Sequence, residues 1–301
     1  MATDRKSGNA GPRATSASRA AIMRLLGRMS GAVARAGAVA ARNPGPENLH
    51  ALRITVRRLR AVLRALEREL NPRLAAELQF DLKNVTRETS AARDADVRRQ
   101  LLMPRVRDTM DLPVDLKRQC AMVLEQARLD DRRALKARMR EGLWTSRLAR
   151  IRTTARHVEL VAWMTQQPLA LVQAALGRVL RDLQRRLARK RLGAERLHRV
   201  RRRIRAARYA AEALLPMVRR SARSLAGSLQ ALQDQLGLTH DLMQTRRFLD
   251  DTLLPEEARG ALAEAVDRQL DRQLKRSRRK LIARMDKGLR DWEPWLEEQH
   301  S

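Results

Sequence analysis

The chain of 301 residues combines an aliphatic composition with a large excess of positive charge. Hydrophobic residues make up 44% and aromatic residues only 2%, while 64 Lys and Arg against 34 Asp and Glu give a formal net charge of +30. Because Ala, Leu, Arg and Glu dominate at helical spacing, a β fold and a fully disordered chain are both excluded. The single cysteine, Cys120, excludes an intrachain disulfide and a multi-cysteine zinc site.

The N-terminal region is basic and lacks the apolar core of a signal peptide. Residues 5–46 contain no acidic side chain, and we interpret residues 1–17 as a disordered basic tail that leads into a helix. The longest uncharged run, 160–177, contains Gln166, Gln167 and Pro168, which makes it a poor membrane span. We therefore expect no export and no membrane insertion, and a cytoplasmic location.

Proline, glycine and asparagine divide the rest of the chain into predicted helices. Pro104 and Pro113 are expected to bound a break, and Gly237 and Pro255 to end helices in the second half. The predicted helices cover 18–42, 46–70, 73–92, 114–141, 169–191, 195–219, 221–237, 239–253 and 256–287. Antiparallel helices with short connections form bundles. The predicted fold is all-α, with a first helical bundle over 18–165 and a second over 166–301.

An internal repeat relates the two halves of the chain. Residues 47–66 match residues 195–214 at an offset of 148, and residues 92–97 match 239–244 at an offset of 147. The paired positions include His50 and His198, Arg53 and Arg201, Arg57 and Arg205, and Arg60 and Arg208. We therefore predict that the bundles are related by pseudo-two-fold symmetry and share a basic central groove or pore.

The repeated helix carries a basic stripe beside an apolar one. At about 100° per residue, its basic side chains fall within about 80° of one another. In the first copy the basic stripe is His50, Arg53, Arg57, Arg60 and Arg64; in the second it is His198, Arg201, Arg205 and Arg208. Like charges at this spacing repel, so the stripe costs stability unless an anion neutralises it. A solvated polar face is the alternative interpretation.

Residues beyond the stripe are candidates for the same site. Lys83 and Arg93 share one face of the predicted third helix, and His240 replaces Arg93 in the second half. Arg93 and His240 each precede an aspartate, Asp94 or Asp241, for which we favour a role in capping a helix or orienting an arginine. For His50 and His198, a phosphate contact near a helix N-terminus and a structural or capping role both stay open.

The motif Leu-His-x-x-Arg-x-x-x-Arg-x-x-Arg, at 49–60 and again at 197–208, resembles the CHAD family (conserved histidine α-helical domain). The resemblance extends over about 18–295 and implies two four-helix bundles with a basic surface that binds inorganic polyphosphate. It assigns binding to the paired histidines and arginines of the two stripes. Ser90 departs from the family pattern, which has glycine at that position.

Three functions compete at this point. The first is a non-catalytic module that binds polyphosphate, with association with polyphosphate granules and the oligomeric state left open. The second is sequence-nonspecific nucleic-acid binding, which the charge also fits; it is expected to be weaker because seven aromatic residues provide few stacking platforms. The third is a metal-dependent phosphohydrolase. This function is disfavoured because the chain has only five histidines, and Arg93 stands in the first half where a metal ligand would be needed. We expect no cofactor.

Overall fold

The computed structural model describes residues 12–108, 112–158, 168–187, 194–214, 216, 223–250, 252 and 254–297. In these ranges the chain is helical throughout, as predicted. The helices are α1 (Pro12–Arg42), α2 (Pro46–Ala65), α3 (Pro72–Glu88), α4 (Ser90–Asp108), α5 (Val114–Arg140), α6 (Gly142–His157), α7 (Pro168–Leu187), α8 (Ala194–Leu214), α9 (Arg223–Asp250) and α10 (Glu256–Glu297).

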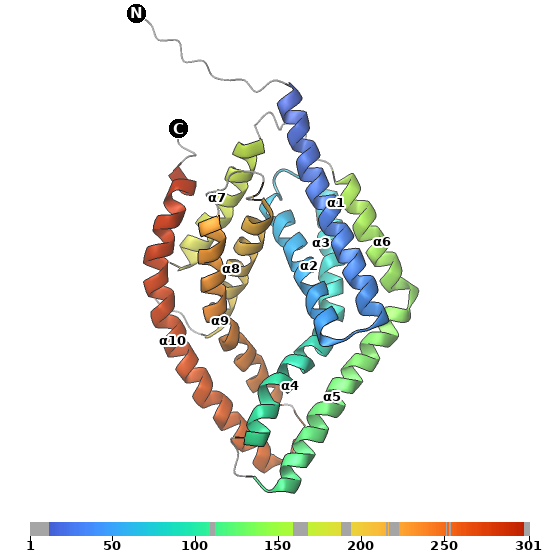
Figure 1. Cartoon of the computed structure of the whole chain (residues 1–301), viewed down its shortest axis with the longest axis vertical. Coiled ribbons are helices and arrows are strands. Elements are labelled where there is room, and N and C mark those ends of the chain that lie inside the picture. Colours follow the sequence, from blue (N-terminus) through green and yellow to red (C-terminus); the bar gives the residue numbers. More distant parts are fainter. Residues whose placement is uncertain are drawn as a thin grey trace, which may run out of the picture.

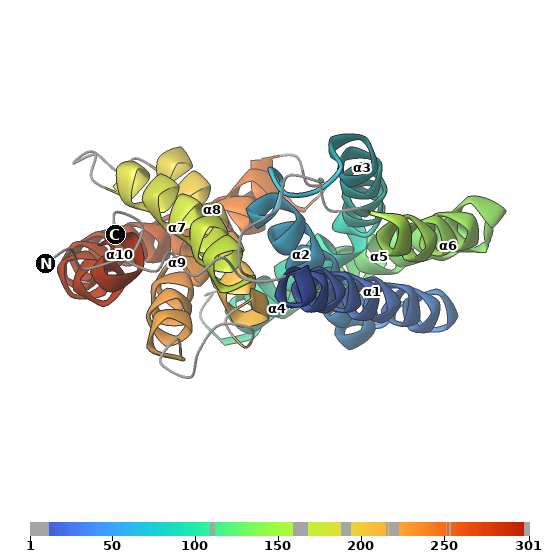
Figure 2. The ribbon, with the colours of Figure 1, turned by 90° about the horizontal axis from the view of Figure 1, so that it is seen from above.

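The helices form two packed groups that meet along α2 and α8. Helices α1, α2, α3 and α6 pack together in one group, and α7, α8, α9 and α10 in the other. Figure 1 shows these groups as the two sides of a diamond, with α4 and α5 reaching down to meet the lower parts of α9 and α10. Seen from above in Figure 2, α2 and α8 lie at the centre, between the remaining helices of the two groups. The helices with the basic stripes are therefore neighbours.

The apolar stripe beside the arginines of α2 forms the centre of the larger core. Its residues are all buried, four on α2 and two just beyond its end at Ala65, where the predicted helix continued to 70: Leu52, Val56, Leu59, Leu63, Leu66 and Leu70. They belong to one continuous cluster that also includes residues of α7, α8 and α9, so a single core joins the two groups of helices. A second cluster, around Leu102 and Leu124 on one side and Leu249 and Leu262 on the other, joins α4 and α5 to α9 and α10. Burial on one face leaves the arginine face of α2 free for other contacts.

Two predicted breaks are wrong because tertiary packing outweighs the local signal. Pro104 lies inside α4, where Leu102 and Val106 on either side of it are fully buried in the second cluster. Gly237 lies inside the continuous helix α9, although a glycine costs a helix interior about 1 kcal/mol relative to alanine. Its neighbour Leu236 is buried in the larger core. The packing of apolar neighbours therefore maintains both helices.

Other helix boundaries also differ from the predictions. Helix α1 begins at Pro12, inside the segment predicted to be a tail, whereas residues 1–11 lie outside the described part of the chain. Helix α6 was not predicted, although Trp144, Leu148 and Ile151 bury one of its faces at helical spacing. The predicted seam near 166–168 falls largely outside the described residues, and α7 begins at Pro168.

The predicted third helix is divided at Thr89. Helix α3 ends at Glu88 with Thr89 as its C-cap, and α4 begins at Ser90. The buried Thr89 hydroxyl donates to the carbonyl of Val85, 2.9 Å away. Lys83 and Arg93 therefore lie on different helices, and the prediction that they share one helix face is wrong.

Candidate polyanion-binding site

Arginines of α2 and α8 converge where the two helices meet. The positive charges of Arg57 and Arg53 both act on Arg205, and the charge of Arg57 acts on Arg201. These are four of the arginines that the sequence repeat pairs with one another. The two stripes thus lie within electrostatic range of each other across the contact between α2 and α8.

A cleft of about 420 Å³ opens along this contact. Seven arginines line it, together with two alanines and a tyrosine, and no acidic residue is among its lining residues. The arginines are Arg57, Arg60 and Arg64 of α2 with Arg199, Arg202, Arg203 and Arg205 of α8. The sequence analysis assigned no binding role to Arg199, Arg202, Arg203 and Tyr209, and it placed Arg64 in the basic stripe of α2. We call this the central cleft.

The central arginines have perturbed pKa values for a common reason. Burial is the largest cause of the lowered pKa in Arg57, Arg201 and Arg205, because a charge loses solvation inside the protein. Repulsion from Arg57 and Arg201 adds to this effect and lowers the pKa of Arg205 to about 9. Each still carries its charge at neutral pH. Within the described residues, none of the three forms an ion pair with an acidic side chain, so their donors are available to an anion.

Arg53 differs from Arg57 because it donates hydrogen bonds to groups of the protein itself. Its side chain is 8% exposed, and its Nη1 donates to the carbonyl of Thr86 and the Ser90 hydroxyl, both at 3.1 Å. Burial and the charge of Arg57 lower the pKa of Arg53 to about 10. Arg53 therefore ties α2 to the junction of α3 and α4.

Asp94 of α4 and Asp241 of α9 sit beside the converging arginines. Burial raises the pKa of each carboxyl, and nearby arginines oppose this effect: Arg53 first for Asp94, and Arg201 first for Asp241. Both lie within helices rather than at helix N-termini, so neither caps a helix as the sequence suggested. The charges of these two acids therefore act on the arginines near the contact between α2 and α8.

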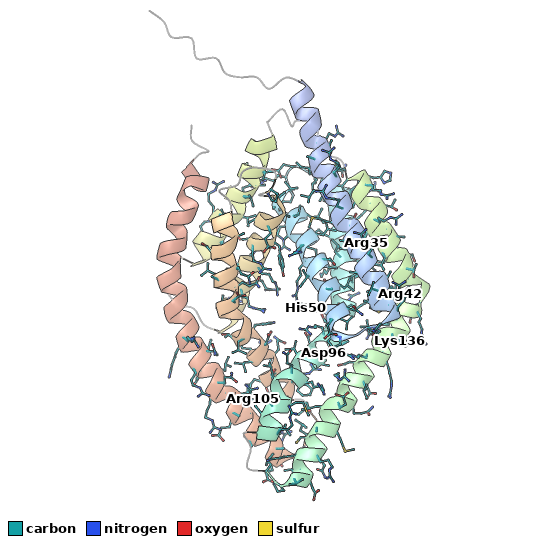
Figure 3. All side chains as sticks on the ribbon, in the orientation of Figure 1. Arg35, Arg42, His50, Asp96, Arg105 and Lys136 are labelled. Carbon is teal, nitrogen blue, oxygen red and sulfur yellow. The ribbon has the colours of Figure 1, made fainter. Side chains whose placement is uncertain are left out.

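His50 and Arg93 line a second cleft of about 420 Å³ at the start of α2. Figure 3 shows His50 on α2, above Asp96 of α4, which lines the same cleft. Loss of solvation lowers the pKa of His50, and the charges of Arg93, Arg57 and Arg53 lower it further. Its imidazole makes no hydrogen bond within the described residues, so no structural role is evident for it. The ring is therefore available to an anion, which would favour its protonated form.

The remaining candidates either have partners within the protein or are not among the residues that line the central cleft. Arg60 lines it, but its Nε also donates to Gln79 Oε1 at 3.2 Å. Arg208 is 9% exposed, pairs with Glu212 at 3.3 Å and covers the Tyr209 ring, with 4.6 Å from Cζ to the centroid. Lys83 is exposed on α3 and does not line either cleft. His240 lies on α9.

His198, the counterpart of His50, lies on α8, but its side chain is outside the described residues. Within the described part of the chain, no group of three or more His, Cys, Asp and Glu side chains could hold a metal ion. In the same ranges, no helix has the length and apolar character needed to cross a membrane.

Helices that position seven arginines along an open cleft define an all-helical protein suited to binding a polyanion, because guanidinium groups bind phosphate oxygens in a bidentate manner. A family model, the CHAD domain, matches residues 20–250, and the chain belongs to the CHAD family. The resemblance seen in the sequence is thereby confirmed.

Two solved structures are similar to the chain. The crystal structure of the CHAD domain from the plant Ricinus communis has a TM-score of 0.62 and 24% identity, over 91% of this chain and 92% of that one. PptA from Streptomyces chartreusis has a TM-score of 0.67 and 16% identity, over 88% of this chain and 96% of that one. At these identities the likeness establishes the fold. No curated protein matches the chain.

Proposed function

We propose that this protein binds inorganic polyphosphate in the central cleft, without catalysis. The observation that carries the proposal is the convergence of Arg57 and Arg205, which line this cleft, with Arg201 nearby; all three are partly desolvated, and none forms an ion pair with an acid in the described residues. Such an array costs free energy until an anion arrives, so ligand binding relieves repulsion as well as forming hydrogen bonds. The association of the CHAD family with polyphosphate supports this ligand.

In this proposal the two stripes act as one site through the pseudo-two-fold repeat. Arg57 and Arg205 are equivalent positions of the repeat, and each contributes a donor from its own helix. A flexible phosphate chain can follow both helices, and each further contact it makes is intramolecular. His50 and Arg93 extend the first half of the site, and His198 and His240 are proposed to extend the second. Lys83 and Arg208 have supporting rather than central places.

Nucleic-acid binding is the weaker alternative. Tyr209 is the one aromatic residue among those that line the central cleft, and it is only 4% exposed. Proteins that bind single strands without sequence preference stack bases on exposed aromatic rings, and this cleft offers no such platform in its described lining. A stiff duplex also resists the bending needed to follow a short cleft between two helices.

We propose that the binding of polyphosphate takes place in the cytoplasm.

The proposal is tested by parallel titrations with polyphosphate, duplex DNA and single-stranded RNA at several salt concentrations. We expect polyphosphate to bind most tightly at each concentration, with log affinity falling linearly with log salt as counterions are released. Tighter binding of either nucleic acid at physiological ionic strength would replace this function with nucleic-acid binding. Polyphosphate recovered at its original length after long incubation would support the absence of hydrolysis.

A further inference from the structure

A third cleft lies between α2, α7 and α8, beyond the predicted stripe. Its volume is about 800 Å³, and residues of all three helices line it. The lining contains six arginines, Arg64, Arg68, Arg178, Arg181, Arg185 and Arg203, against two acids, Glu67 and Asp182. We call it the α7 cleft. Its arginines on α7 belong to no motif that the sequence analysis singled out.

The arginines of the α7 cleft divide into paired and available groups. Arg178 forms an ion pair with the buried Glu69, and Arg203 Nη1 lies 3.6 Å from Asp182 Oδ2. In contrast, Arg181 and Arg185 have no hydrogen bond or ion pair within the described residues, and Arg185 is exposed. They are four residues apart on α7, so both side chains project on the same side of that helix. Their charges point to an anionic ligand.

The α7 cleft is continuous with the central cleft. Four residues line both of them: Ala61 and Arg64 of α2, and Arg203 and Ala206 of α8. At this junction the charge of Arg203 lowers the pKa of Arg64, after the larger effect of burial. The two alanines keep side-chain bulk small where the clefts meet. A chain that leaves the central cleft past Arg64 and Arg203 therefore arrives directly at α7.

We propose that the α7 cleft is a second segment of the binding path for polyphosphate. Arg181 and Arg185 contact only chains that are long enough to pass the junction at Arg64 and Arg203. This inference rests on the proposed function of the central cleft. It makes the protein selective for chain length, because short chains are held by the central arginines alone. Long chains also form contacts in the α7 cleft. These contacts add to the affinity because the chain has already lost its translational freedom by binding in the central cleft.

The test compares charge-reversal variants on size-fractionated polyphosphate, with pyrophosphate as the short ligand. The variant R181E/R185E removes the α7 contacts, and K136E/R140E is the matched control. The control pair is also four residues apart, both of its side chains are exposed, and it makes the same change in net charge on α5. Figure 3 shows Lys136 on the outer side of α5. The neutral variant R181Q/R185Q gives the same comparison with less perturbation of the fold.

We expect R181E/R185E to lower the ratio of long-chain to pyrophosphate affinity about tenfold or more, and K136E/R140E to leave that ratio at its wild-type value. The salt slope for long chains should also decrease in magnitude by about two, one for each lost phosphate contact. An unchanged ratio in both α7 variants, with R57E/R205E still losing binding, would overturn the second segment and leave the central site intact. Loss of binding to the same degree in the control would show that net charge alone is responsible. No binding of polyphosphate by the wild-type chain would overturn the proposed function itself.

Discussion

Arg57 of α2 and Arg205 of α8 lie close enough that the charge of Arg57 contributes to lowering the pKa of Arg205 to about 9, second only to burial. The predicted repeat pairs these two residues, and both line the central cleft. Neither forms an ion pair with an acidic side chain in the described residues, and this supports the proposal that an anionic ligand binds between them.

Charge reversal at this pair should remove much of the affinity for polyphosphate. Each charge-assisted hydrogen bond contributes about 1.5–3 kcal/mol, so we expect R57E/R205E to weaken binding by about tenfold or more. The measurement is isothermal titration calorimetry with a long polyphosphate. R138E/R259E, which changes net charge equally outside the clefts, serves as the control. Equal losses in the two variants would show that the site has no special role.

Neutralising the same pair should stabilise the free protein. The lowered pKa of Arg205 means that the folded state holds its proton less firmly than the unfolded chain, so the charged form costs free energy below about pH 9. We expect R57Q/R205Q to raise Tm by about 1–2 °C, which corresponds to roughly 1 kcal/mol for a chain of this size. Added polyphosphate should then raise the Tm of the wild type more than that of the variant. A fall in Tm would contradict the repulsion inferred here.

Substitution of Arg53 should destabilise the free protein, although Arg53 belongs to the same stripe as Arg57. Its Nη1 donates to the carbonyl of Thr86 and to the Ser90 hydroxyl, and R53Q would leave these contacts unmade in a buried region. We expect the free energy of unfolding to fall by about 1–3 kcal/mol, measured by urea denaturation. Stabilisation by R53Q would place this residue with the binding arginines instead.

Binding should also become tighter as the pH falls below neutral, where His50 takes up a proton in the complex. The surroundings of His50 lower its pKa in the free protein, so protonation of the histidine opposes folding at acidic pH. A bound polyanion favours the protonated imidazole and raises this pKa, so binding takes up a proton. Each unit by which binding raises the pKa of His50 makes the affinity at pH 5 at most about tenfold higher than at neutral pH. H50Q should have a flatter pH profile.

The matched control for this experiment is H157Q. His157 lies at the end of α6, where its Nδ1 is 2.8 Å from the Thr153 carbonyl, away from the clefts. The H157Q profile should therefore follow the wild type. If the wild type and H50Q had the same dependence on pH, His50 would have no contact with the ligand.

Much of the fold follows from the spacing of apolar residues. The stripe from Leu52 to Leu70 is buried as its spacing predicts, because one face of a helix has to leave water. Pro104 and Gly237 are local signals, and they failed because buried apolar residues on either side keep α4 and α9 helical. The end of α5 was predicted at Glu141, but α6 was missed, although Trp144, Leu148 and Ile151 recur at helical spacing after Gly142.

The site was predicted in part, for a similar reason. Angular position alone identifies Arg57 and Arg205, since it shows which side chains share a face. It cannot distinguish Arg208, whose guanidinium is taken by Glu212 and the Tyr209 ring, from an arginine that is available. Nor can it indicate that Arg181 of α7 lies beside the stripe helices, because that depends on how the helices pack.

The central claim is that one cleft joins both stripes into a single site for a polyphosphate chain, and the dependence of affinity on chain length tests it most directly. The measurement is calorimetry with size-fractionated polyphosphate at physiological ionic strength, beginning with pyrophosphate. We predict that affinity rises steeply with length and reaches a plateau once the chain spans both stripes, because later contacts are intramolecular. Pyrophosphate binding as tightly as the longest chains would contradict a shared cleft and indicate a pocket for small phosphates.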